Sequence, residues 1–134
     1  MVVATFPLVS LSFLPNNSPT VATFNSATGE INVLTAGAAY SVSASSAQPF
    51  SVVSGQELYV SFSCTADSSR EVQVELKKRV NPTGAFASQK VVCNGQINQP
   101  LTPNQTFDDT RVSVNVGDKV GKVTIGQIVV KKKK

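Results

Sequence analysis

The chain has 134 residues, of which 41% are hydrophobic and only 15% are charged, and it contains no histidine and no tryptophan. A chain of this length forms one ordinary domain that buries roughly two-thirds of the surface exposed when it is unfolded, so folding needs neither a metal nor many disulfides. The composition is typical of a β-rich globular protein and excludes a disordered one. The lack of histidine removes the commonest general base and metal ligand.

The charges divide the chain into two unlike halves. Residues 1–69 carry three acidic side chains and no basic one, a charge of −3, whereas residues 70–134 carry 12 basic side chains and the other five of the eight acidic ones, a charge of +7. Soluble surfaces usually carry about 25–35% charged residues. We therefore expect part of the first half, mainly residues 1–35, to be covered by a partner or by other copies of the chain.

The N-terminal stretch is apolar but lacks the features of an export signal. Residues 1–14 have no basic group, include Pro7 and are too short to span a membrane, so we expect neither a cleaved signal peptide nor a membrane anchor. Apolar and polar residues alternate there as in a strand, which makes this stretch a candidate arm that adds a strand to a neighbouring subunit's sheet. The apolar positions of the candidate arm are Val2, Val9, Leu11 and Phe13.

Several short extended runs follow in the first half. Residues 20–24 and 30–35 flank a five-residue loop that ends in Gly29, a pattern that predicts a hairpin. Residues 38–45 continue the alternation of apolar and polar positions, with Tyr40 among the apolar ones. We expect each of these runs to be a strand.

The most regular alternation lies in the middle of the chain. Residues 58–64 and 72–76 alternate apolar with polar side chains on either side of a polar turn at residues 67–69. Such alternation places one face on a core and one in water, so we expect two antiparallel strands joined as a hairpin. The expected core comprises Leu58, Val60, Phe62, Val72, Val74, Leu76, Val112, Val114, Val123 and Ile125.

An Asn-Gly pair marks a second expected hairpin. Asn94 and Gly95 separate the extended runs at residues 87–93 and 96–101. Both residues accept positive φ, which makes the pair the strongest short signal for a hairpin turn.

The last extended run changes phase. Its apolar positions shift after Ile125, which predicts a β-bulge at Gly126. Turn signals recur about every eight to twelve residues along the chain, which favours a sandwich or a barrel of nine to ten strands in a single domain over residues 1–134.

Three stretches resemble the galactose-binding-like jelly roll of carbohydrate-binding modules. They are Gly-Gln-Glu-Leu-Tyr-Val-Ser-Phe at residues 55–62, the Arg-x-Val-x-Val-x-Leu pattern at residues 70–76 and Gly-Lys-Val-Thr-Ile-Gly-Gln-Ile-Val-Val at residues 121–130. In that family an aromatic-rich strand follows a glycine turn and a last strand closes the sandwich. The resemblance implies an all-β, antiparallel jelly-roll β-sandwich over about residues 55–130, and sugar binding on aromatic platforms.

The polar positions of the expected strands supply a possible ligand face. These positions are Tyr59, Ser61, Ser63, Gln73, Glu75, Arg111, Ser113 and Asn115. Sugar rings lie on flat aromatic rings, and this set has only one. An ordinary solvated sheet face is therefore the simpler interpretation.

Two further groups could carry chemistry. Cys64 and Cys93 fall on apolar faces, so a disulfide fits if their strands pack together, but without an export signal two free thiols are favoured. Asp108, Asp109 and Asp118 could offer oxygen ligands to calcium. Acidic loop residues more often serve as solvated turn formers, so we expect no metal and no cofactor.

Four consecutive lysines, Lys131, Lys132, Lys133 and Lys134, form a basic tail. Runs of like charge are usually solvated and often serve as interaction tails. Because no aromatic residue is interleaved, we expect salt-dependent attraction to phosphates but no sequence-specific nucleic-acid site.

These features favour a binding role over catalysis. Serine is abundant, but no histidine can activate it and no carboxylate pair suits acid–base chemistry, so we expect no enzyme activity. The first expectation is a structural protein of a large assembly, most simply a virion component such as a capsid decoration (cement) protein or a small tail or neck protein. Its partners would be other copies or a capsid protein, in a virion or other extracellular assembly built without a signal peptide, or otherwise in the cytoplasm. The alternative is a carbohydrate-binding module or lectin-like adhesin.

Overall fold

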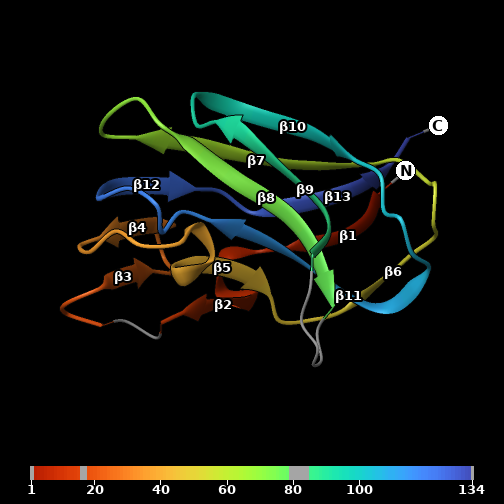
Figure 1. The fold of residues 1–134 in the computed structure, drawn as a ribbon, viewed down its shortest axis with the longest axis horizontal. Coiled ribbons are helices and arrows are strands. Elements are labelled where there is room, and N and C mark those ends of the chain that lie inside the picture. The colour runs from red at the N-terminus through yellow and green to blue at the C-terminus, as the bar shows by residue number, and fades with distance from the viewer. Residues whose placement is uncertain (1, 16–17, 79–84, 134) are drawn as a thin grey trace.

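Two antiparallel β-sheets pack face to face in the computed structural model, which describes residues 2–15, 18–78 and 85–133 (Figure 1). Sheet A has the order β1 (Val2–Phe6), β13 (Ile128–Lys132), β7 (Leu58–Ala66), β12 (Gly121–Ile125), β4 (Glu30–Val33) and β3 (Ala22–Asn25), and β10 (Gly95–Leu101) pairs with the other edge of β7. Sheet B has the order β2 (Leu11–Leu14), β5 (Ser43–Ser46), β11 (Phe107–Asn115), β8 (Glu71–Lys78) and β9 (Ala85–Val92), and β6 (Phe50–Val52) pairs with β11.

Two short 3-10 helices, η1 (Leu8–Ser10) and η2 (Ala39–Ser41), complete the described elements. The fold is an all-β jelly-roll sandwich, as predicted, but its described part has 13 strands and not nine to ten. The Asn-Pro-Thr-Gly sequence at residues 81–84 predicts a further turn, but it lies outside the described residues.

The core between the sheets is the one that the alternation predicts. All ten expected core side chains are at most 1% exposed, so the prediction is confirmed. Phe62 is the largest of the fully buried side chains and lies on β7, the strand with neighbours along both edges.

We expect the Phe62→Ala substitution to lower the free energy of unfolding by about 3–5 kcal/mol, because it removes a buried ring and leaves a cavity. Denaturant unfolding followed by circular dichroism measures this loss. Ser63→Ala, at an exposed neighbouring position, is the matched control. A loss of under about 1 kcal/mol for Phe62→Ala would contradict the burial of this ring.

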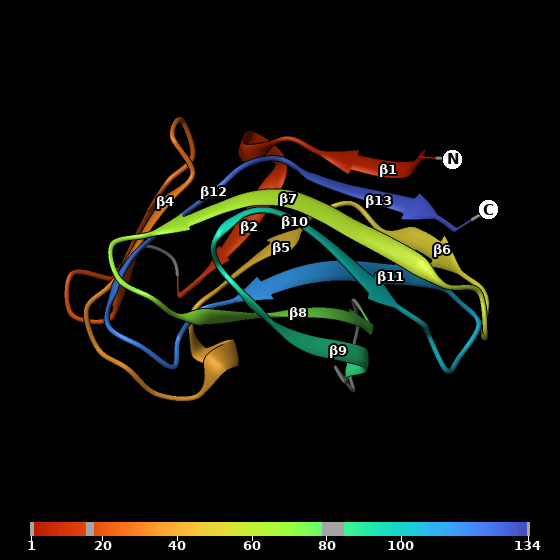
Figure 2. The ribbon, with the colours of Figure 1, turned by 90° about the horizontal axis from the view of Figure 1, so that it is seen from above.

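The expected hairpin of residues 58–64 and 72–76 is wrong. β7 belongs to sheet A and β8 to sheet B, so the turn between them crosses from one sheet to the other (Figure 2). Alternation tells which side chains face the core, but it is the same whether the next strand lies in the same sheet or in the facing one.

The Asn-Gly hairpin is wrong for the same reason. β9 pairs with β8 in sheet B and β10 pairs with β7 in sheet A, so the segment at Asn94 and Gly95 is a second crossing. Gly95 does adopt the positive φ that the pair predicts, at +104°. Positive φ thus permits a sharp change of direction without deciding which strand is joined next.

A disulfide between Cys64 and Cys93 fastens the two crossings to each other, so the favoured expectation of free thiols is corrected. The two Cα atoms are 5.1 Å apart, and the backbone N–H of Cys93 donates to the carbonyl of Arg70 over 3.0 Å. Cys64 lies in sheet A, and the second crossing brings Cys93 back beside it. The sequence does not reveal this return, because it depends on how the sheets stack.

Two local predictions are confirmed. β3 and β4 pair as a hairpin, and Gly29 in its loop has φ +81°. The predicted bulge also occurs. Ile125 pairs with Cys64 and Val129 with Ser61, so the chain advances four residues from Ile125 to Val129 while β7 advances only three. The extra residue lies in the segment that contains Gly126.

The candidate arm lies within its own domain. β1 pairs with β13 at the edge of sheet A, and β2 pairs with β5 at the edge of sheet B. Phe6 is buried, while Leu11 and Phe13 pack against the core. Val2 and Val9 are exposed, so only part of the apolar set of residues 1–14 packs on this sandwich. That this segment adds a strand to a neighbouring subunit's sheet stays a prediction.

Candidate functional site

The outer face of sheet B carries a continuous set of polar side chains. Because Val74, Leu76, Val112 and Val114 face the core, the residues that alternate with them point outward. Strand pairing sets these residues in three rows across the sheet. We call this set the polar face: Ser43, Asn115, Gln73 and Lys90 in the first row, Ser12, Ser45, Ser113, Glu75 and Ser88 in the second, and Arg111 and Lys77 in the third.

A chain of hydrogen bonds links the middle of the polar face. Ser45 Oγ donates to Ser113 Oγ over 3.0 Å, and Ser113 Oγ donates to Asn115 Oδ1 over 2.6 Å. Asn115 Nδ2 then donates to Gln73 Oε1 over 2.9 Å. Ser113 and Asn115 are fully buried, so they hold their neighbours in place. This bond holds the amide oxygen of Gln73 toward Asn115. The Nε2 group of Gln73 therefore points the other way, where it can donate a hydrogen bond to a ligand.

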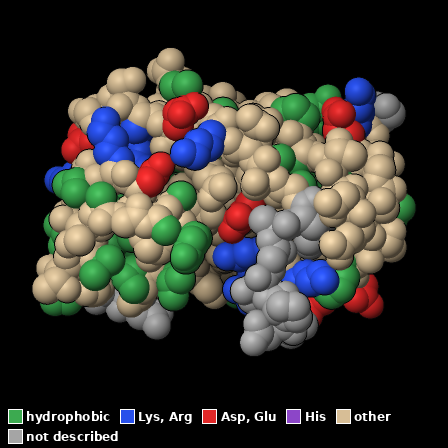
Figure 3. Space-filling model, in the orientation of Figure 1, with side chains coloured by type: hydrophobic (Ala, Val, Ile, Leu, Met, Phe, Trp, Pro, Cys, Tyr) green, Lys and Arg blue, Asp and Glu red, His purple; other side chains and the backbone are tan. Residues whose placement is uncertain are grey.

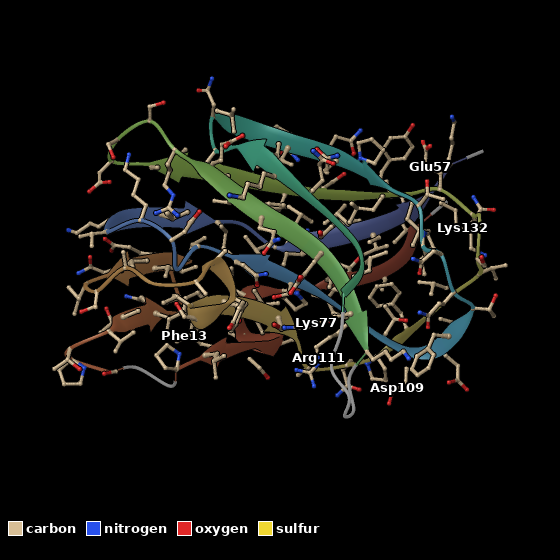
Figure 4. All side chains as sticks on the ribbon, viewed as in Figure 1. Phe13, Glu57, Lys77, Asp109, Arg111 and Lys132 are labelled. Atoms are coloured by element: carbon tan, nitrogen blue, oxygen red, sulfur yellow. A yellow bond between two sulfur atoms is a disulfide. The ribbon has the colours of Figure 1, made fainter. Side chains whose placement is uncertain are left out.

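The third row of the polar face is charged. Lys77 and Arg111 are register partners, and Lys77 Nζ lies 3.8 Å from Glu75 Oε1 (Figure 4). Burial lowers the pKa of Lys77, while Glu75 raises it and Arg111 lowers it again. The third row thus has only charged side chains, whereas the first and second rows each have one, Lys90 and Glu75, among neutral polar groups.

An exposed tyrosine stands beside the first row. Tyr40 is 66% exposed and belongs to η2, which projects on the outer side of sheet B (Figure 2). The backbone N–H of Gly117 donates to the carbonyl of Ala39, and a Cβ at Gly117 would come within 2.7 Å of the Val42 nitrogen. The expectation that residues 38–45 form one strand through Tyr40 is therefore wrong, because residues 39–41 form η2, and the sequence did not single out this ring. Gly117, two residues past Asn115, is the signal that a segment packs closely there.

The predicted ligand face is divided between two surfaces. Gln73, Glu75, Arg111, Ser113 and Asn115 belong to the polar face. The other three residues lie on β7, whose polar positions face outward from sheet A on the opposite side of the sandwich. These three are Tyr59, Ser61 and Ser63. The division follows directly from the placement of β7 and β8 in different sheets.

A shallow hollow of roughly 250 Å³ lies on the outer face of sheet A. Its lining comprises Ser61, Phe62, Ser63, Gln96, Gln127, Val129 and Lys131. Ser61 and Asn98 share a short hydrogen bond beside it. This second polar surface has Tyr59 on the same strand as Ser61 and Ser63.

The three candidate calcium ligands are not brought together. Asp108 and Asp109 lie at the start of β11, whereas Asp118 follows its end and pairs with Arg70 over 3.2 Å. Nine residues of extended chain span about 30 Å. Within the described ranges, no group of three or more histidine, cysteine or acidic side chains could hold a metal ion.

Arg70 is a buried residue that the sequence reading did not single out. Its side chain is 2% exposed, and it donates to the carbonyls of Val116 and Lys119, each over 2.9 Å. Burial lowers the pKa of Arg70, while Asp118 and then Asp67 raise it. Arg70 fastens the first crossing to the turn after β11, so its role is structural.

The basic tail is partly a strand. Lys131 and Lys132 extend β13 and pair with β7, while the backbone N–H of Lys133 donates to the carbonyl of Glu57 over 3.1 Å. Lys133 Nζ also lies 3.6 Å from Glu57 Oε1. Lys131 and Lys133 are exposed, as a solvated run of like charge predicts, although their backbone is held beside β7. Lys134 lies outside the described residues, and a role of the tail in interactions stays a prediction.

Charged side chains are unevenly spread over the sheet B side of the molecule. Figure 3 shows hydrophobic side chains at the lower left, where β2 and β3 lie, and charged ones along the upper edge and near the middle. This pattern agrees with the low charge of residues 1–69. That a partner covers residues 1–35 stays a prediction.

No protein-family model and no curated protein matches the chain. Among the helices in the described part, none is long and apolar enough to cross a membrane.

Solved structures do resemble it. The apo CBM1 module of BiXyn10A matches with a TM-score of 0.74 at 13% identity, over 98% of this chain and 99% of that one. The second N-terminal cellulose-binding domain of Cellulomonas fimi β-1,4-glucanase C matches with a TM-score of 0.64 at 17% identity, over 98% and 97%. A carbohydrate-binding module of Cellvibrio mixtus lichenase 5A, in complex with cellotriose, matches with a TM-score of 0.60 at 15% identity, over all of both chains.

These matches identify the fold. The chain has the jelly-roll β-sandwich of carbohydrate-binding modules across nearly its whole length, which confirms the resemblance stated from the sequence. The whole chain thus resembles carbohydrate-binding modules, which are not catalytic domains.

Proposed function

We propose that this protein is a carbohydrate-binding module that holds a polysaccharide chain on accessible members of the polar face, among them Gln73, Ser88 and Lys90. The buried members orient these side chains from below; they are Ser43, Ser45, Ser113, Asn115 and Glu75. The observation that carries the proposal is the hydrogen-bonded chain from Ser45 through Ser113 and Asn115 to Gln73. The likeness in fold to modules described as binding cellulose or cellotriose supports it.

The chemistry of the polar face suits a ligand rich in hydroxyl groups. Such a ligand needs donors and acceptors that are already oriented, since ordering side chains on binding costs free energy. The buried amide of Asn115 orients Gln73 in this way. Tyr40 adds an exposed ring beside the first row, on which the apolar face of a sugar can lie.

The disulfide bears on where the protein works. Disulfides persist in oxidising surroundings and are rare in the reducing cytosol. We therefore propose that the protein acts outside the cytosol, where it would meet polysaccharides. The Cys64–Cys93 bond supports this over the cytoplasmic alternative.

The likeness in fold supports a carbohydrate-binding module better than it supports a structural protein of a large assembly. The matched structures named above are modules for carbohydrate, and none of them is described as part of a virion. A virion component, with subunits or a capsid protein as partners, stays a prediction.

Affinity electrophoresis in gels that contain neutral or acidic polysaccharides tests the proposal. We expect retardation by at least one polysaccharide, and we expect Gln73→Ala to weaken that binding about three- to tenfold, since one hydrogen bond contributes about 0.5–1.5 kcal/mol. Gln127→Ala, in the hollow on sheet A, is the matched control.

Two outcomes would contradict the proposal. Absence of retardation by every polysaccharide in the panel would remove the function. Loss of binding in Gln127→Ala with normal binding in Gln73→Ala would move the site to the outer face of sheet A.

A further inference from the structure

A second hollow, of roughly 320 Å³, lies on the outer face of sheet A, at the end formed by β3, β4 and β12 (Figure 1). We call it the hairpin hollow, because most of its lining belongs to the hairpin of β3 and β4. Its lining comprises Thr23, Phe24, Asn25, Glu30, Asn32 and Lys122. Sites for small ligands usually measure about 300–1,000 Å³, so the hairpin hollow reaches the size of a small binding site.

Strand pairing arranges the polar side chains here in two rows. They are Thr23, Asn32 and Lys122 in one row, and Asn25, Glu30 and Thr124 in the next. The intervening residues Ile31 and Val33 are fully buried, so the side chains that alternate with them point away from the core. All six polar residues are at least partly exposed. Two amides, two hydroxyls and one pair of opposite charges thus face the solvent together.

The loop of the hairpin holds these groups in place. The backbone N–H of Ala27 donates to Asn25 Oδ1 over 2.9 Å, so the Nδ2 group of Asn25 points the other way. The backbone N–H of Ile125 donates to the carbonyl of Gly29 over 3.0 Å, which fastens the loop to β12. A Cβ at Gly29 would collide with the carbonyl oxygen of Ile125, so this contact requires glycine. A ligand therefore meets groups that are already ordered, which lowers the free-energy cost of binding.

The charges of the hairpin hollow cancel. Lys122 Nζ lies 3.6 Å from Glu30 Oε1, and these two residues are the charged members of the lining. An ionic ligand would gain little from a pair of opposite charges. Hydroxyl groups, in contrast, can donate to the Glu30 carboxylate and accept from the Lys122 ammonium. Adjacent hydroxyls of one sugar ring can thus bond to the ion pair while others meet Asn25 or Asn32.

We propose that the hairpin hollow is a second carbohydrate site, which takes uncharged sugar units, so that one molecule binds two polysaccharide chains. The polar face looks outward from sheet B and the hairpin hollow outward from sheet A, with the core between them. The inference shares its ligand class with the proposed function and adds a site on the opposite surface. A protein that holds one chain on each side bridges the two, and linked binding events raise the overall affinity for a dense polysaccharide.

The hairpin hollow is expected to bind more weakly than the polar face. The ring in its lining, that of Phe24, packs against the core, whereas Tyr40 beside the polar face is 66% exposed. Sugar rings gain affinity by lying on an exposed aromatic ring. Retardation in gels therefore reports mainly on the polar face, and the second site needs a method suited to weak binding.

Nuclear magnetic resonance of the isotope-labelled protein tests the inference. The probes are cellohexaose, xylohexaose, laminarihexaose and mannohexaose, each added at millimolar concentration. We expect at least one of them to shift the amide signals of β3, β4 and β12, including the side-chain amides of Asn25 and Asn32. No shift of these signals with any of the four sugars would overturn the inference.

Two substitutions locate the sugar. Asn32→Ala and Lys122→Gln should each weaken binding in the hairpin hollow about three- to tenfold, because each removes about one hydrogen bond. Asn104→Ala, at an exposed loop position outside both sites, is the matched control and should bind as the unmodified protein does. The Lys122 side chain is 58% exposed, so Lys122→Gln folds even if Asn32→Ala does not. Unchanged binding by either variant, when its spectrum is that of a folded protein, would overturn the inference.

Viscosity measures the bridging of two chains. The polysaccharide built from the sugar that binds is mixed with the protein at a concentration above both dissociation constants. We expect the viscosity to rise, and to rise less with Asn32→Ala or with Gln73→Ala, because each variant weakens one of the two sites. Equal viscosity with and without the unmodified protein would overturn the bridging.

Failure of the inference differs from failure of the proposed function. Shifts confined to the polar face, as at Gln73, would keep the proposed function and overturn the second site. Shifts confined to the hairpin hollow would keep the second site and contradict binding on the polar face. Shifts at neither surface, together with no retardation by any polysaccharide, would overturn both.

Discussion

Removing residues 1–14 is expected to unfold the domain. This segment supplies an edge strand to each sheet, β1 to sheet A and β2 to sheet B. The ring of Phe6 lies 5.8 Å from that of Phe50, and the ring of Phe13 lies 5.2 Å from that of Phe24. The deletion would therefore expose aromatic rings at both edges of the core.

The expected loss exceeds the stability of a typical domain. Truncating one buried phenylalanine costs about 3–5 kcal/mol, and a whole domain is stable by about 5–15 kcal/mol. The deletion removes Phe6, Phe13 and the hydrogen bonds of two strands. We expect the far-ultraviolet circular dichroism to lose its β signature and thermal melting to lose its cooperative transition.

A substitution in the same segment provides the control. Val9 is 79% exposed, so Val9→Ser should melt cooperatively near the temperature of the unmodified protein. A truncated protein that is folded and melts cooperatively would contradict this expectation and would support the interpretation of residues 1–14 as a separate arm.

Removing the disulfide is expected to lower the free energy of unfolding by about 3–4 kcal/mol in the double variant Cys64→Ala, Cys93→Ala. The bond closes a loop with a sequence separation of 29, and a cross-link of this length restricts the unfolded chain by about that amount in the loop-entropy account. Chemical denaturation of the variant and of the unmodified protein measures the difference.

Reduction supplies an independent check on the disulfide. Dithiothreitol should destabilise the unmodified protein by a similar amount and leave the double variant unaffected. Two results together would show that Cys64 and Cys93 are not bonded. Dithiothreitol would leave the stability of the unmodified protein unchanged, and free thiols would be detected in the unfolded protein without reductant.

The sequence by itself determined which side chains face the core and where several turns fall. The alternation at residues 58–64 and 72–76 identifies buried positions correctly because successive strand residues point to opposite faces, a property of each strand alone. The hairpin at Gly29 and the bulge at Gly126 are equally local, since each depends on a few adjacent residues.

The tertiary structure alone decided which strands are partners. β7 and β8 are consecutive yet lie in facing sheets, and so do β9 and β10. These crossings bring Cys93 to Cys64, separate Tyr59 from Gln73, and gather Gln73, Lys77 and Arg111 on one surface. Strand pairing joins residues that are far apart in the chain. The alternation of apolar and polar residues within one strand does not indicate which other strand pairs with it. The candidate site could therefore be read from the sequence as a set of outward-facing residues, but its division into two faces depends on how the sheets stack.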